Sequence, residues 1–176
     1  MSSAGPARVQ CDVWIGAAVR RVWDLVTDIH LPARLSPELQ RVAWLDGALR
    51  PAVGARFEGH NSHPLLGEWR TVSHVVRLDE HRAFGWAVVD EDGRFGEPAG
   101  GPAEALASWR YELEAEGDGT RLRQEAVLGP GRNGVTLAVE RRPDRREEIL
   151  AFRVGELRAG MEKTLAGIKE LAERAG

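Results

Sequence analysis

The chain has 176 residues, of which 43% are hydrophobic and 29% are charged, and its formal net charge is −3. This mixture predicts one globular domain over residues 1–176 and excludes an intrinsically disordered chain. Because the net charge is small and its signs are interspersed, we expect no nucleic-acid partner.

The cysteine content and the hydropathy of the chain limit the cellular compartments in which we expect the protein. Cys11 is the only cysteine, so no intramolecular disulfide can form, and its alternating surroundings predict a buried strand residue. No apolar run approaches the roughly 18 residues of a membrane span, and residues 1–8 are not of the signal-peptide type. We therefore expect a cytoplasmic protein without membrane insertion. Arginine greatly outnumbers lysine, which indicates a GC-rich bacterial genome.

The first part of the chain predicts one strand followed by two short helices. Hydrophobic residues alternate with polar ones over residues 9–15, which is typical of a strand. Over residues 19–29 they recur at spacings of three and four, which indicates an amphipathic helix of about three turns. Pro32 and Pro37 bracket a second helical segment of one or two turns.

The middle of the chain predicts about six further strands joined largely by hairpins. Asp46-Gly47 and Asp118-Gly119 are typical of tight turns. Residues 90–105 are rich in glycine and proline and form a longer loop, either a functional lid or a solvated excursion. The alternating segments cover residues 41–44, 55–60, 69–78, 83–89, 109–113 and 122–128.

The strongest periodic pattern lies near the C-terminal end. It predicts a helix over residues 144–174, about 46 Å long at 1.5 Å per residue. A short helix is also expected over residues 135–141, ahead of Pro143. The apolar stripe of the long helix, at spacings of three and four, consists of Leu150, Val154, Leu157, Met161, Leu165 and Ile168.

This order of elements predicts an α+β fold, because the helices are segregated from a run of hairpin-linked strands. A sheet of about seven strands exposes one broad apolar face, and only the last helix is long enough to cover it. We therefore expect a curved antiparallel sheet wrapped around that helix, with the two short helices closing one end. Such a wrap is expected to leave a cavity between sheet and helix.

The order resembles the helix-grip superfamily (SRPBCC), which includes START domains, Bet v 1-like plant allergens and bacterial polyketide cyclases. The chain is similar to the polyketide cyclase/dehydrase-like branch over nearly its whole length. That resemblance implies a small hydrophobic ligand, such as a polyketide or lipid. The motifs that carry it are Val22-Trp23-Asp24-Leu25-Val26-Thr27-Asp28, Gly54-Ala55-Arg56-Phe57-Glu58-Gly59-His60-Asn61, and Gly129-Pro130-Gly131 ahead of the last helix.

In several predicted strands, aromatic residues occupy the alternate positions that also hold the apolar residues. A cavity wall made of such rings suits a flat apolar ligand. The alternative is that these rings are ordinary core filling. Asn61, at the end of its strand, is a candidate polar contact at the mouth. The predicted ligand-binding residues are Trp44, Phe57, Asn61, His74, Phe84, Trp86, Trp109, Tyr111, Leu157 and Met161.

His74 and Tyr111 are the candidate acid or base groups. His74 shares its parity with apolar neighbours, and an imidazole facing a cavity can exchange protons at neutral pH. Trp69 and Val75 occupy the opposite parity, however, so the facing of this strand stays open and an outward histidine is favoured. Tyr111 offers its hydroxyl group to a ligand carbonyl.

Motifs of the common cofactor and hydrolase sites are absent, including phosphate-binding glycine loops and the G-x-S-x-G and H-E-x-x-H patterns. His60 and His63 lack further metal ligands at a recognisable spacing. The sequence therefore predicts neither a metal site nor a cofactor. Three functions stay open: a binding protein for a hydrophobic ligand, a cyclase, aromatase or dehydratase enzyme, and a structural or regulatory protein with a filled core. Exposed strand edges also leave room for a homodimer.

Three glycines interrupt the predicted last helix, each at a cost of about 1 kcal/mol relative to alanine. They are Gly155, Gly160 and Gly167. Gly160 and Gly167 flank the apolar stripe. Their small size either lets the sheet approach closely, which we favour, or leaves volume for a ligand.

Overall fold

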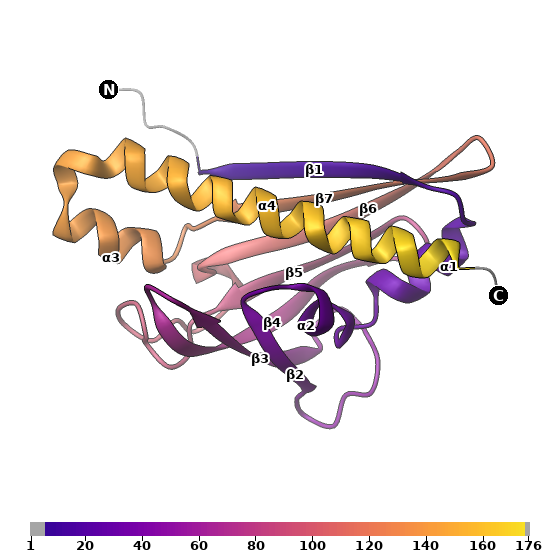
Figure 1. The fold of residues 1–176 in the computed structure, drawn as a ribbon. Coiled ribbons are helices and arrows are strands. Elements are labelled where there is room, and N and C mark those ends of the chain that lie inside the picture. The colour runs from indigo at the N-terminus through magenta and orange to yellow at the C-terminus, as the bar shows by residue number, and fades with distance from the viewer. Residues whose placement is uncertain (1–5, 175–176) are drawn as a thin grey trace.

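The structure is a computed structural model that describes residues 6–174 as one sheet and four α-helices (Figure 1). The strands are β1 (Arg8–Ile15), β2 (Leu39–Trp44), β3 (Arg56–His63), β4 (Gly67–Asp79), β5 (Ala83–Val89), β6 (Ala107–Glu116) and β7 (Gly119–Leu128). The helices are α1 (Val19–Val26), α2 (Leu31–Leu35), α3 (Gly134–Arg141) and α4 (Arg146–Glu173), with short 3-10 turns at Pro102–Glu104 and Pro143–Arg145.

All seven strands form one antiparallel sheet in the order β1-β7-β6-β5-β4-β3-β2. Figure 1 shows α4 lying along one side of this sheet beside β1, with α3 near its N-terminal end and α1 near its C-terminal end. The predicted α+β helix-grip fold is therefore confirmed. The edge strands are β1 and β2.

Several predicted boundaries shift for local reasons. Helix α1 ends at Val26 rather than at residue 29, and α4 begins at Arg146 because Pro143–Arg145 forms a 3-10 turn ahead of it. The β6–β7 turn is formed by Gly117 and Asp118, one residue earlier than expected, and Gly117 supplies the positive φ of 62° that this turn needs. Asp46-Gly47 does form a turn, but the β2–β3 connection continues beyond it to residue 55.

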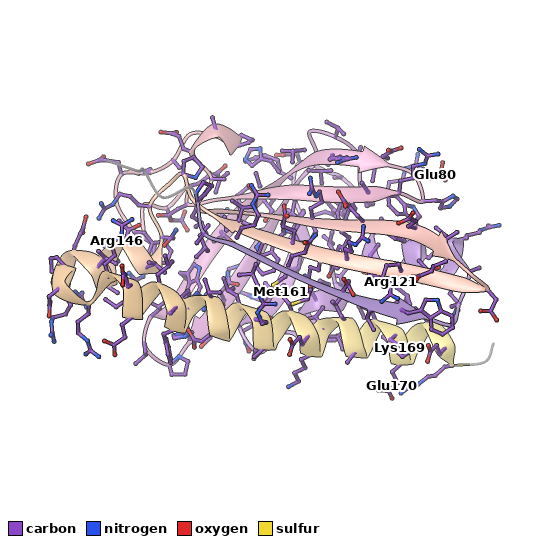
Figure 2. All side chains as sticks on the ribbon, turned by 90° about the horizontal axis from the view of Figure 1, so that it is seen from above. Glu80, Arg121, Arg146, Met161, Lys169 and Glu170 are labelled. Carbon is purple, nitrogen blue, oxygen red and sulfur yellow. The ribbon has the colours of Figure 1, made fainter. Side chains whose placement is uncertain are left out.

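The core lies between the concave face of the sheet and the C-terminal half of α4. Helix α4 buries its apolar stripe only from Leu157 onward, because its first turns extend past the sheet towards α3. In Figure 2, Met161 lies on the side of α4 that faces the sheet, whereas Glu170 points away from it. Helix α1 closes the other end of the core with three buried residues, Val22, Trp23 and Val26.

No helix in residues 6–174 has the length and apolar character needed to cross a membrane.

Candidate ligand-binding cavity

A cavity of about 680 Å³ lies between the sheet and α4. Its size falls within the range of 300–1,000 Å³ that is usual for small-molecule sites. Strands β2 to β7 supply one side, and α2, α3 and α4 supply the other. Exposed lining residues, among them Leu65 in the β3–β4 turn and Phe152 in α4, place the mouth near the N-terminal end of α4.

The inner wall of the cavity is an aromatic cluster centred on Trp86. Cross-strand pairing sets Phe84 opposite Tyr111 and Trp86 opposite Trp109 on neighbouring strands. The Trp86 ring lies 5.1 Å from Phe84, 5.8 Å from Tyr111 and 6.4 Å from Phe57, between ring centroids. Its stacked neighbour Trp109 is nearly parallel, at 12° and 6.5 Å. Both indoles are only partly buried, so they retain area that faces the cavity.

The structure brings eight of the ten predicted ligand-binding residues to the cavity wall. Asn61 is among them, and its Nδ2 donates to Thr71 Oγ1 at 3.4 Å. The eight are Phe57, Asn61, Phe84, Trp86, Trp109, Tyr111, Leu157 and Met161.

The predictions of Trp44 and His74 as ligand-binding residues have to be corrected, because neither side chain lines the cavity. Trp44 lies beside the wall and packs edge-on against Phe57, with ring centroids 5.5 Å apart. His74 lies on the other face of the sheet, where its Nε2 is 3.7 Å from Glu91 Oε1. His74 is therefore removed from the candidate ligand-binding and acid or base groups, and its outward orientation is the one that the strand pattern favoured.

A bulge in β4 explains the misleading pattern around His74. Trp69, Thr71 and Ser73 face the cavity, so His74 on the opposite parity faces outward. The pairing with β5 then shifts register between Val75 and Arg77. This shift returns Leu78 to the core side and leaves Val76 47% exposed. The apolar residues around His74 thus do not share one face.

Tyr111 is 1% exposed, and burial raises the pKa of its phenol above the ordinary value. The phenol is therefore neutral at physiological pH and cannot serve there as a base. Gln124 Nε2 donates to its hydroxyl oxygen at 3.4 Å. Gln124 was not among the predicted site residues, although it is a polar residue on the inward-facing side of β7, which it shares with Leu122 and Ala126.

A network of charged and polar side chains lies across the mouth of the cavity, between α4 and the β2–β3 edge. Arg153 donates to Glu38 at 2.5 Å and to Glu156 at 3.4 Å, and His63 Nε2 lies 2.9 Å from Glu156. The backbone N–H of Leu65 donates to His63 Nδ1 at 3.0 Å, so Nε2 carries the ring proton and donates to Glu156. Burial opposes the charge of Arg153, but its hydrogen bond with Glu38 and the two carboxylates outweigh that effect and raise its pKa. From the sequence, His63 was a candidate only as a metal ligand, so its place at the mouth was not predicted.

Two glycines of α4 each fit one of the two predicted roles, which are close packing and open volume for a ligand. A Cβ at Gly160, which lines the cavity, would approach only Pro37 Cδ at 3.9 Å. A Cβ at Gly167 would lie 2.7 Å from Leu35 Cδ2, so Gly167 permits close packing, against α2 rather than against the sheet. A Cβ at Gly155 would meet nothing within 4 Å. Gly160 therefore leaves volume in the cavity.

Within residues 6–174, no group of three or more His, Cys, Asp or Glu side chains is placed to hold a metal ion. His60 and His63 lie on opposite faces of β3, since His63 lines the cavity and His60 pairs with Glu58 at 3.6 Å.

The family model described as "Polyketide cyclase / dehydrase and lipid transport" matches residues 6–173. The chain belongs to this family. A search of curated proteins finds no match. Among solved structures, a Polyketide_cyc-like protein from Corynebacterium glutamicum is similar, with a TM-score of 0.64 and 27% identity over 94% of this chain and 91% of the other.

Two further structures share the fold of this polyketide cyclase/dehydrase family member. The di-domain ARO/CYC protein BexL of the BE-7585A biosynthetic pathway matches with a TM-score of 0.67 and 20% identity, over 97% of this chain. This chain spans 51% of that protein, about half its length. The protein Ara h 8.0201 matches with a TM-score of 0.51 and 12% identity, over 86% of this chain and 96% of its own. Identities this low establish the fold alone.

Proposed function

We propose that the protein binds a small hydrophobic or aromatic molecule, polyketide- or lipid-like, in the cavity between the sheet and α4. The observation that carries the proposal is a cavity of about 680 Å³ whose inner wall consists of the Trp86 aromatic cluster. Aromatic walls with few polar groups gain free energy by removing the apolar surface of a ligand from water. A cavity of this volume argues against the alternative of a filled core.

An enzyme of the cyclase, aromatase or dehydratase type is the second candidate, since the family description names polyketide cyclases and dehydrases beside lipid transport. In such an enzyme the cavity would hold a flexible substrate in a reactive shape, which by itself lowers the barrier. The predicted acid and base groups supply little support. His74 faces away from the cavity, burial keeps Tyr111 neutral, and both ring nitrogens of His63 are occupied. Binding is therefore the better supported function.

Native mass spectrometry of protein purified from cells tests the proposal. We expect a species heavier than the mass of the polypeptide, whose excess mass disappears when the same sample is denatured. Extraction of that sample should release a hydrophobic small molecule. A protein that shows only its polypeptide mass under native conditions, and that takes up no compound from a broad hydrophobic panel, would contradict binding.

The cytoplasmic location, the bacterial source and a homodimer stay predictions of the sequence.

A further inference from the structure

A buried polar pair interrupts the apolar wall of the cavity. Gln124 is 5% exposed and Tyr111 is 1% exposed, and both line the cavity. They are cross-strand partners on β6 and β7, in the same row as Phe84 on β5. Gln124 Nε2 donates to the hydroxyl oxygen of Tyr111, but Gln124 Oε1 has no hydrogen-bond partner anywhere in residues 6–174.

Gln124 lies on the cavity wall, so whatever occupies the cavity has to supply the hydrogen-bond donor that the protein does not give to Oε1. Leaving a buried acceptor without a donor costs about 1–3 kcal/mol, so native structures almost always pair such atoms. The inward neighbours of Gln124 on β7 are Leu122 and Ala126, both buried. A leucine at position 124 would match these surroundings without leaving an unpaired atom. A ligand that fills the cavity without donating to Oε1 would leave this acceptor unpaired, whereas a ligand that donates to Oε1 avoids that cost.

The free hydrogen-bonding capacity of the pair defines the group that fits. Gln124 Oε1 can only accept, and the Tyr111 hydroxyl, which already accepts from Nε2, retains a proton to donate. A ligand hydroxyl group both donates and accepts, so it satisfies the two atoms together. A ketone or ether can accept from Tyr111 but leaves Oε1 unpaired. A carboxylate brings a negative charge into a site whose burial already disfavours ionisation of the phenol.

We propose that Gln124 and Tyr111 form a hydrogen-bonding anchor that selects ligands with a neutral hydroxyl group, a phenol or an alcohol, on an otherwise apolar skeleton. The anchor adjoins the aromatic cluster, since the Tyr111 ring lies 5.8 Å from that of Trp86. A planar ligand that stacks on Trp86 can therefore direct its hydroxyl group to the pair. This inference rests on the proposed binding function and adds to it the chemical group that is recognised.

Three probes of one shape test the anchor: 2-naphthol, 2-methoxynaphthalene and 2-methylnaphthalene. The first donates and accepts, the second only accepts, and the third does neither. Ligand-observed NMR titrations give their dissociation constants for the wild type, for Gln124→Leu and for Tyr111→Phe. We expect the wild type to prefer 2-naphthol over both analogues by about tenfold, the equivalent of one to two net hydrogen bonds.

Gln124→Leu should reduce that preference to about twofold or less while binding of 2-methylnaphthalene is retained or strengthened. Tyr111→Phe should reduce it in the same direction, which keeps the test valid if either variant folds poorly. Thermal unfolding of each variant reports folding separately. Equal binding of the three probes by the wild type, or an unchanged preference in both variants, overturns the anchor and leaves the binding function intact. Failure of the wild type to bind any of the probes would count against the binding function itself.

Discussion

The glycines of helix α4 meet different surroundings, and their substitution separates cavity volume from close packing. Gly160→Leu should leave stability nearly unchanged or slightly raised, because it enters open volume and improves helix propensity by up to about 1 kcal/mol. Gly167→Leu gains the same propensity but collides with the end of the Leu35 side chain, so we expect an overpacking cost of about 1–3 kcal/mol.

Urea unfolding of the two variants measures this difference directly, since the propensity gain is common to both. A less stable Gly160→Leu, or a Gly167→Leu as stable as the wild type, would contradict the assignment of these two residues.

Helix α4 is an element with two parts, one packed on the sheet and one beyond it. Ile168 is fully buried in the packed part, whereas Phe152 is 59% exposed at the mouth of the cavity. Ile168→Ala should therefore lower the free energy of unfolding by about 2–5 kcal/mol through lost burial and the remaining void. Phe152→Ala should change it by less than about 0.5 kcal/mol. Chemical denaturation of both variants checks the contrast, and equal losses would show that the helix packs along its whole length.

The contact of α4 with the β2–β3 edge of the sheet differs in kind from the apolar packing of the core. Hydrogen bonds and ion pairs through Arg153, Glu156 and His63 hold it, whereas the helix from Leu157 onward also packs its buried apolar stripe on the core. A mouth fastened by hydrogen bonds and ion pairs can open without exposing a large apolar surface. This arrangement suits the entry of a ligand past Leu65 and Phe152.

Across the whole molecule, carboxylates at the surface make the stability depend on pH. The pKa of each of these groups is lowered because its side chain accepts a hydrogen bond from a neighbouring arginine or lysine. The groups are Asp46, Glu58, Glu116, Glu140, Asp144, Glu148 and Glu173.

A folded-state pKa below the unfolded value, which is about 4 for these groups, contributes stability above that pH. This contribution is lost as the pH falls through the folded-state values. Thermal midpoints should therefore fall between about pH 4 and pH 2, and less so at about 1 M salt, where screening weakens exposed pairs. A midpoint that is independent of pH over this window, at low salt, would contradict the prediction.

The architecture followed from periodicity, because each strand and the long helix bury one face and repeat at their own period. The alternation in residues 83–89 and 109–113 correctly placed Phe84, Trp86, Trp109 and Tyr111 on one wall. The facing of residues 69–78 stayed open because a bulge in β4 changes parity after His74, and no residue pattern marks a bulge of this kind. The mouth was missed for another reason. The bonds that tie α4 to His63 and Glu38 join residues 93 and 115 positions apart, and only the folded chain brings them together.

The fluorescence of the six tryptophans tests the central claim, a cavity that holds a flat hydrophobic molecule. The measurement is a titration of the wild type, Gly160→Leu and Gly155→Leu with 1,8-dihydroxyanthraquinone. Both substitutions add the same side chain to the same helix, but only position 160 lines the cavity. We expect saturable quenching of the wild type and of Gly155→Leu, and an apparent affinity reduced at least about tenfold in Gly160→Leu. Equal quenching of all three proteins, or no saturable quenching of the wild type, would contradict a ligand-binding cavity.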